Sequence, residues 1–202
     1  MNKIKIFILT VLFSQFISCD NDEITGQDTI YIAGVEVADN GKTVATYWVN
    51  NQQISLTNGT YSSNANSIFV LGQDVFVAGY EYNVDGKPIA KYWKNGIEAI
   101  LSNNWSLATS ITVSGTDVYV AGYEQIGDGT KTIAKYWKNG IASDLTDGTS
   151  YDFTSSIKVI NNDIYITGGQ KNGNLIAKYW KNGKSVILST GTDTNAYANS
   201  ID

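Results

Sequence analysis

Two short segments recur along the chain and constrain its fold more than any other feature. The first, Asp-Val-Phe-Val-Ala-Gly-Tyr-Glu at 74–81, returns almost unchanged at 117–124, with looser copies at 28–36 and 163–170. The second, Ile-Ala-Lys-Tyr-Trp-Lys-Asn-Gly at 89–96, returns at 133–140 and 176–183, with a degenerate copy at 44–50. The tryptophans of this second segment lie 45, 44 and 43 residues apart. The chain is therefore built from about four copies of a unit of ~44 residues.

Each unit contains four runs that are typical of β-strands, as the region from 109 to 145 illustrates. Thr109–Ser114 alternates, with Ile111 and Val113 on one face. Asp117–Tyr123 is apolar on both faces, as expected of a strand between two layers. Thr132–Lys138 and Ile141–Leu145 follow, joined by Asn-Gly, a pair that favours a two-residue hairpin. No helical period appears after the N-terminal segment.

The order of these features resembles kelch-type repeats over residues 28–202. One strand is followed by a second that ends in Gly and by a third that carries an aromatic pair. The resemblance is incomplete, because only Gly168-Gly169 has the double glycine and because Tyr and Trp are adjacent here. It implies an all-β propeller of four-stranded blades, with copies that start near 28, 74, 117 and 163. A β-solenoid and an open array are the structural alternatives.

The frame of the repeats predicts how such a ring closes. No innermost strand precedes Asp28, whereas Ala196–Ile201 matches the innermost strand that begins at Asn64. Pairing of this C-terminal strand with the N-terminal blade would close four blades and remove two free edges. The alternatives are a homodimer that shares an eight-bladed ring and a piece of a larger ring.

The first residues resemble a bacterial lipoprotein leader. Lysines at 3 and 5 precede an apolar run that is too short to span a bilayer, as in a signal peptide over 1–18. Phe-Ile-Ser-Cys at 16–19 resembles a lipobox and implies lipidation of Cys19, with residues 19–27 as a tether. The acidic stretch at 20–23 resembles surface-export signals of Gram-negative lipoproteins, which implies an outer-membrane protein at the cell surface. An ordinary signal peptide with an incidental Cys is the alternative.

Composition excludes several classes of function. The chain has 14 Lys, no Arg, no His, one Cys and a net charge of −5. It lacks the commonest general base and metal ligand, so we expect neither a metal site nor a cofactor. The acidic balance argues against nucleic-acid binding. No nucleophile elbow is present, and we expect a protein that is not an enzyme.

The loops between the second and third strands and between consecutive units share one end of the fold. Loops on a rigid scaffold commonly carry binding sites, and aromatic platforms beside carboxylates suit a sugar. Trp105 is the strongest candidate because it departs from the repeat. The candidate ligand-binding residues at this end are Trp105, Tyr61, Tyr151, Tyr197, Tyr80, Tyr123, Glu36, Glu81 and Glu124. The alternative is that these aromatic residues only cap the blade interfaces.

Residues that recur in every unit are interpreted as structural. The tryptophans are expected to pack one blade on the next. The lysines two residues earlier (91, 135 and 178) are expected to cover apolar surface with their stems. The Asp that opens each second strand is expected to accept hydrogen bonds from turn amides. The sequence therefore predicts a surface-anchored module that binds a glycan or a protein. A structural subunit completed by another chain and a glycosidase using Glu81 and Glu124 are the alternatives.

Overall fold

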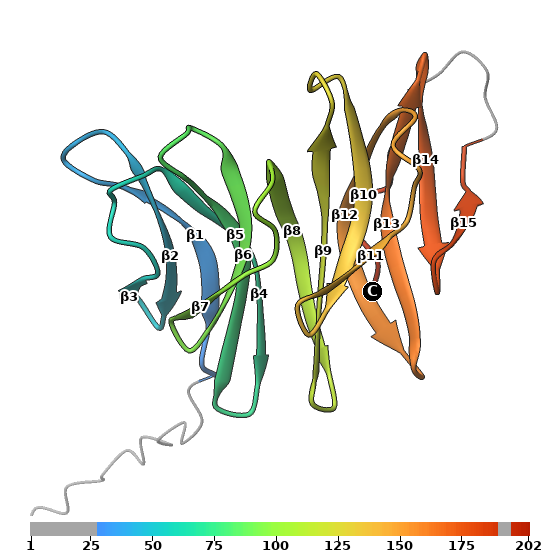
Figure 1. The fold of residues 1–202 in the computed structure, drawn as a ribbon. Helices are drawn as coiled ribbons and strands as arrows, with labels where there is room; N and C mark the ends of the chain where they lie inside the picture. The colour runs from blue at the N-terminus through green and yellow to red at the C-terminus, as the bar shows by residue number, and fades with distance from the viewer. Residues whose placement is uncertain (1–27, 190–194) are drawn as a thin grey trace, which may run out of the picture.

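The structure is a computed structural model that describes residues 28–189 and 195–202. The predicted signal peptide at 1–18 and the predicted tether at 19–27, with Cys19, lie outside these residues. All fifteen strands are antiparallel and form four sheets in chain order (Figure 1). The first sheet is β1 Tyr31–Val37, β2 Thr43–Val49 and β3 Gln52–Ser55. The second is β4 Ser63–Leu71, β5 Asp74–Tyr82, β6 Pro88–Lys94 and β7 Ile97–Ile100. The third is β8 Ser106–Ser114, β9 Asp117–Ile126, β10 Lys131–Lys138 and β11 Ile141–Asp144. The fourth is β12 Tyr151–Ile160, β13 Asp163–Asn172, β14 Asn174–Lys181 and β15 Lys184–Ile187.

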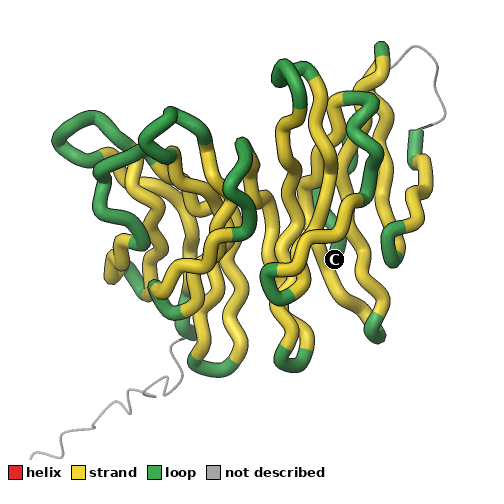
Figure 2. Tube along the Cα trace, viewed as in Figure 1, coloured by secondary structure: helices red, strands yellow, loops and turns green. Residues whose placement is uncertain are grey.

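The predicted all-β class and the predicted unit are confirmed. The described chain consists of strands and loops, without a helix (Figure 2). The second, third and fourth sheets each have four strands in meander order, and the first has three. The Asn-Gly hairpins form as predicted, since Asn139 and Gly140 have φ values of 52° and 81°. Both residues tolerate the positive φ that this tight turn needs.

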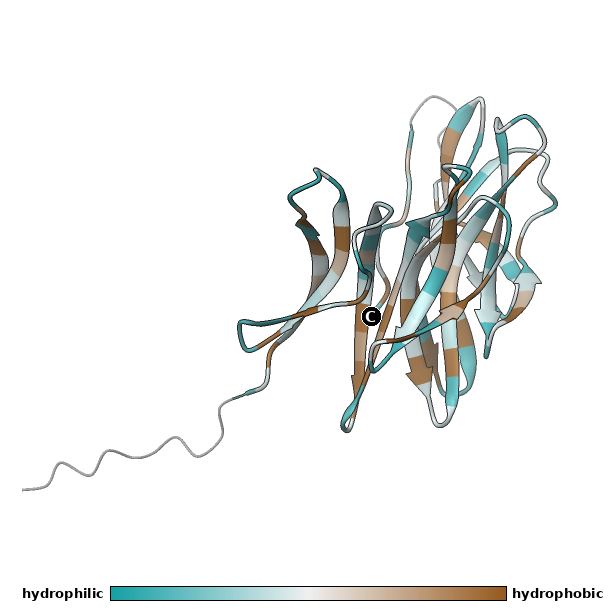
Figure 3. Cartoon of the chain, turned by 60° about the vertical axis from the view of Figure 1, so that its left-hand side comes forward, coloured by the Kyte–Doolittle hydropathy of each residue, from teal (hydrophilic) through white to brown (hydrophobic). Residues whose placement is uncertain are grey.

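Each sheet packs on the next through alternating side chains. In β9, Val118 and Val120 face the second sheet, whereas Tyr119 and Ala121 face the fourth. The strand is apolar on both faces because it lies between two layers, as the sequence indicated. Bands of apolar residues therefore cross the strands (Figure 3).

The repeated tryptophans pack one sheet on the preceding one. Trp93 packs among residues of the first sheet, Trp137 among those of the second and Trp180 among those of the third. All three are 1% exposed or less, and their indole N–H groups have no hydrogen-bond partner among the described residues. Their contribution is therefore apolar contact. This confirms the predicted packing role for three of the four copies.

Neighbouring sheets also meet through their innermost strands, β4, β8 and β12. Each of these strands has a β-bulge near its start. The main-chain N–H of Ile111 donates to Ser67 Oγ and that of Ile157 to Ser110 Oγ, both at 3.2 Å. The bulge also brings a carbonyl against the second strand, so a Cβ on Gly122 would lie 2.1 Å from the Leu107 oxygen. The glycine repeated in the second strand is thus required by close approach.

The predicted closure by the C-terminal strand is wrong for the described residues. The N–H groups of Ala196 and Ala198 donate to the carbonyls of Leu175 (2.9 Å) and Gly168 (3.3 Å), which belong to the fourth sheet. The first sheet keeps three strands, and β1 pairs only with β2 in the part of the chain that the structure describes. The C-terminal segment packs on the fourth sheet because that sheet directly precedes it in the chain, as each earlier innermost strand packs on the sheet before it. The four sheets form an open row (Figure 1).

Candidate functional site

Aromatic side chains form a continuous row across the third and fourth sheets at the loop end. Ring centroids of Trp105 and Tyr123 are 6.1 Å apart, and those of Tyr123 and Tyr151 are 6.3 Å apart. Tyr151 contacts Phe153 at 6.3 Å, and Phe153 contacts Tyr197 at 6.5 Å. Their tilted or edge-on geometry is that of stabilising aromatic pairs. We call these five residues the aromatic row.

The row joins elements that are distant in the sequence. Trp105 precedes β8, Tyr123 lies in β9, Tyr151 and Phe153 open β12, and Tyr197 lies in the C-terminal segment. Tyr151 and Tyr197 are exposed and the other three are half-buried, so the row offers ring surface to a ligand while its members hold one another. Burial, followed by the neighbouring Tyr151, raises the pKa of the Tyr123 hydroxyl, which therefore stays protonated as a hydrogen-bond donor.

The sequence identified four of the five members of this row. Phe153 was missed, although it occupies the repeat position of Leu107, an innermost-strand residue that the periodicity could have flagged. The other predicted aromatic residues lie elsewhere. Tyr80 pairs with Tyr82 at 5.8 Å, and the ammonium of Lys42 lies 5.3 Å from the ring centroid of Tyr61.

A groove of about 570 Å³ opens beside Tyr151, between the third and fourth sheets. Hydroxyl and ammonium groups line it, and no carboxylate does. The lining residues are Thr130, Lys131, Thr149, Ser150, Tyr151, Lys171 and Gly173. Lys131 and Lys171 bring two ammonium groups to the groove, while its Thr130 and Thr149 hydroxyls donate to the neighbouring carboxylates of Asp128 and Asp147.

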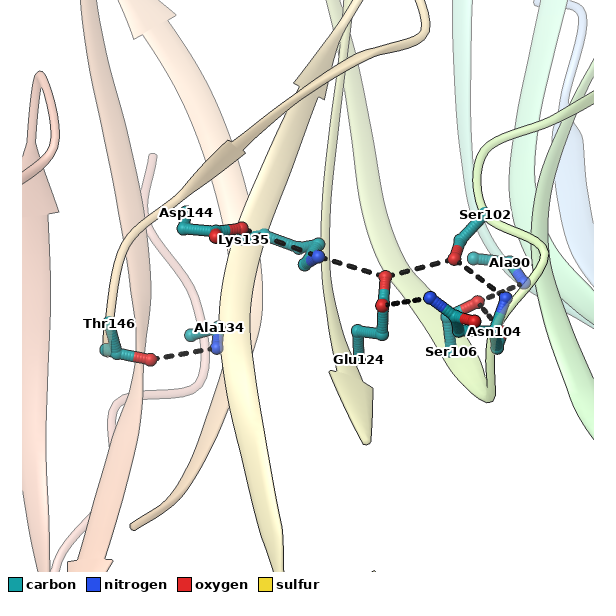
Figure 4. Close-up of polar contacts among 9 residues, drawn as sticks. All are labelled: Ala90, Ser102, Asn104, Ser106, Glu124, Ala134, Lys135, Asp144 and Thr146. Carbon is teal, nitrogen blue, oxygen red and sulfur yellow. Dashed lines mark hydrogen bonds and ion pairs between the residues drawn. The ribbon is translucent and has the colours of Figure 1, made fainter. Parts of the chain in front are cut away.

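The predicted carboxylates are held by the repeated lysines. Glu124 Oε2 accepts a hydrogen bond from Lys135 Nζ at 2.9 Å, and two residues of the preceding sheet's loop, Ser102 and Asn104, donate to the same carboxylate at 3.0 and 2.6 Å (Figure 4). Burial alone would raise the pKa of Glu124, but these hydrogen bonds outweigh it and lower the pKa. Glu124 therefore joins the second sheet to the third.

Glu81 repeats this arrangement one sheet earlier. Lys91 Nζ lies 2.6 Å from Glu81 and 2.8 Å from Glu98. Burial lowers the pKa of Lys91, yet the two carboxylates raise it by more, so the ammonium stays charged. The lysine stems were expected to cover apolar surface, and the carboxylate partners of their ammonium groups were missed. The register explains the contact, because Lys91 pairs with Gly79, two residues from Glu81 on the same strand face.

The remaining carboxylates play local roles. Glu36 is exposed and accepts a hydrogen bond from Gln53, whereas Gln170, its counterpart in the last unit, is bonded by Lys178 and donates to Ser150 Oγ at 2.7 Å. The Asp that opens β9, Asp117, accepts from the side-chain amide of Asn139 at 2.8 Å and pairs with a lysine. The repeated Asp therefore contacts the turn through the side-chain amide of the turn's Asn.

Asp152 is a site residue that the sequence analysis did not single out. It is fully buried below the groove, where Ser150 Oγ donates to Oδ1 at 2.9 Å. Its Oδ2 has no hydrogen-bond partner among the described residues. The signal was the substitution itself, since Ser63 and Ser106 occupy this position in the earlier units.

No known family matches the chain, and no curated protein is significantly similar to it. Within residues 28–189 and 195–202, no helix could cross a membrane and no three acidic or thiol side chains gather as metal ligands. Fold and site together define a repeat protein of stacked antiparallel sheets with a row of aromatic side chains at its loop end.

Proposed function

We propose that the protein is a surface-anchored lipoprotein that binds a glycan on its loop face. The aromatic row carries this proposal. Sugar rings have apolar faces that stack on aromatic side chains, and their hydroxyls need donors and acceptors at the edge of the platform. Tyr151 supplies the platform, and the groove beside it supplies the exposed hydroxyl oxygens of Thr130 and Thr149 as acceptors, since both hydroxyl groups already donate to aspartates.

The charge of the groove narrows the ligand class to acidic sugars. Lys131 and Lys171 are exposed and flank Tyr151. An ammonium group on either side of a stacked ring would bind the carboxylate of a uronic acid or a sulfate ester. We assign the groove a binding role and not a catalytic one, because Glu81 and Glu124 belong to different sheets and each is paired with its own lysine.

The anchor and the finer fold are also part of the proposal. The motif at 16–19 supports lipidation of Cys19, and the acidic residues after it support display on the outer membrane. The meander sheets with the innermost strands side by side support kelch-like propeller blades.

The test is a titration of the secreted chain, carrying Cys19→Ser, with acidic and neutral oligosaccharides by calorimetry. We expect saturable binding of an acidic oligosaccharide and weaker binding of its neutral counterpart. Trp105→Ala and Tyr151→Ala should each lower the affinity at least tenfold, which corresponds to about 1.4 kcal/mol. Tyr82→Ala is the matched control, because Tyr82 and Tyr151 are both 37% exposed and Tyr82 lies outside the row. Circular dichroism verifies the fold of each variant.

Two results would refute the proposal. One is the absence of saturable binding across the panel, which would leave a protein partner as the ligand of this face. The other is binding that the two row variants leave unchanged. If neutral and acidic sugars bind with equal affinity and the two row variants weaken both, the row stands and the assignment of Lys131 and Lys171 fails.

A further inference from the structure

A cross-strand pair of apolar residues is repeated at every sheet-to-sheet contact. Val77 lies opposite Trp93, and the same register pairs Val120 with Trp137 and Ile166 with Trp180. All six side chains are 1% exposed or less. Each pair is covered by the preceding sheet, whose Tyr and Ala residues form the receiving surface.

The first sheet presents the same pair without a cover. Ile32 lies opposite Trp48 in β1 and β2. Here Ile32 is 54% exposed and Trp48 is half-buried. The pair lines a groove of about 380 Å³ together with Ile30 and Asn50. None of the described residues covers this face, although its composition matches that of the three buried faces.

The outer face of the fourth sheet matches a receiving surface. Tyr165 and Tyr179 occupy the repeat positions of Tyr119 and Tyr136, which pack around Trp180. Leu188 occupies the position of Leu101, yet Leu188 is 53% exposed whereas Leu101 is 8% exposed. The outer face of the first sheet and the outer face of the fourth sheet therefore match the two sides of a buried sheet-to-sheet contact.

The C-terminal segment already occupies the place of a further innermost strand on this face. The Ala196 N–H donates to the Leu175 carbonyl. At the equivalent position of an earlier contact, the Asp152 N–H donates to the Thr132 side chain at 2.7 Å. Residues 197–201 also match the sequence of β4 from Asn64 to Ile68. Among the described residues, this segment pairs with no second strand and β1 pairs with no innermost strand.

We propose that a second copy of this chain docks its first sheet on the fourth sheet of its neighbour. In this complex Ile32 and Trp48 pack on Tyr165 and Tyr179, and β1 pairs with the C-terminal segment of the neighbour. The contact is head-to-tail, so it builds a ring if the rotation closes and a filament if it does not. This inference does not depend on glycan binding.

Light scattering on the secreted chain with Cys19→Ser tests the proposal. We expect the mass to rise with concentration in multiples of the chain mass. Ile32→Lys should keep the chain monomeric, because it places a charge in the contact, and Leu188→Lys should do the same from the other side. Ile141→Lys is the control, since Ile141 is 74% exposed on another surface. All three residues are more than half exposed, so the variants should fold, as circular dichroism verifies.

Mixing the two variants shows the polarity of the contact. Ile32→Lys keeps an intact fourth sheet and Leu188→Lys an intact first sheet, so an equimolar mixture should form a complex of twice the chain mass and nothing larger. A wild-type chain that is monomeric at every concentration would overturn the proposal. So would Leu188→Lys assembling like the wild type, which would indicate a head-to-head contact, and so would an equimolar mixture that stays monomeric.

Discussion

Replacing the same tryptophan in two units measures how much of the stability resides in sheet-to-sheet packing. Trp137 is 1% exposed between the second and third sheets, whereas Trp48 is half-buried on the outer face of the first. The repeat supplies the control, because both residues occupy one position of one motif. We predict that Trp137→Ala destabilises the chain far more than Trp48→Ala.

The magnitude follows from burial. A fully buried tryptophan removes about 150–250 Å² from water, which corresponds to about 4–6 kcal/mol at 25 cal/mol per Å². Truncations of buried aromatic residues cost about 3–5 kcal/mol, and no hydrogen bond is lost, because the Trp137 indole N–H has no partner among the described residues. Trp48 keeps much of its surface in water, and we expect a cost of about 1–2 kcal/mol for its removal.

Urea unfolding followed by circular dichroism gives both values, at a concentration where light scattering shows a monomer. The slope of the free energy with urea should be equal in the wild type and both variants, which validates the comparison. Equal losses for the two substitutions would refute the reasoning, because they would mean that the Trp48 face is covered within a single chain. A loss for Trp137→Ala below 1 kcal/mol would refute the packing role itself.

Three further predictions address the close approach, the charge network and the anchor. Gly122→Ala should cost about 2–3 kcal/mol in urea unfolding, because its Cβ would meet a carbonyl oxygen at 2.1 Å, whereas Gly140→Ala, with open space but a φ of 81°, should cost about 1 kcal/mol. Folding lowers the pKa of Glu124, so its stabilisation is present above the unfolded pKa of about 4.3 and is lost as pH falls through the folded value. In Glu124→Gln the urea midpoint should therefore fall less steeply than in the wild type as the pH is lowered through the acid range. An unchanged dependence of the midpoint on pH would contradict this. Cys19→Ser should move the protein from the membrane fraction to the soluble fraction, and retention in the membrane would contradict lipidation.

The unit of the fold could be predicted from the sequence because its signals are local. Asn139-Gly140 allows positive φ at two consecutive residues, and strand β9 is apolar at odd and even positions alike. Both features act within a few residues and recur in every copy. The boundaries of β9 were less predictable, since the strand continues to Ile126 past the expected end at Tyr123. The hydrogen bonds with β10 that extend it depend on tertiary pairing.

The arrangement of the ends and the partners of the charged residues could not be predicted. Whether the segment after Asn195 pairs with β1 or packs on the fourth sheet depends on which surface is closer in space, and the repeat pattern is compatible with both. The lysine partners were missed for a related reason, because Lys135 meets Glu124 only through the register of β9 and β10. The repeat position marks Phe153 as an innermost-strand residue, but its place between Tyr151 and Tyr197 depends on tertiary packing.

The positions where the repeat changes coincide with the face that we propose for ligand binding. The loop before β8 is two residues shorter than the loop before β4 and one residue shorter than the loop before β12. Trp105 lies directly before the strand, next to Tyr123. One unit later, Asp replaces the repeated Ser at 152 and Tyr151 precedes it. Repeated residues such as Trp137 support every contact equally and can carry no individual specificity. In a linear array of near-identical units, a binding site has to arise from such departures, which here gather at the junction of the third and fourth sheets.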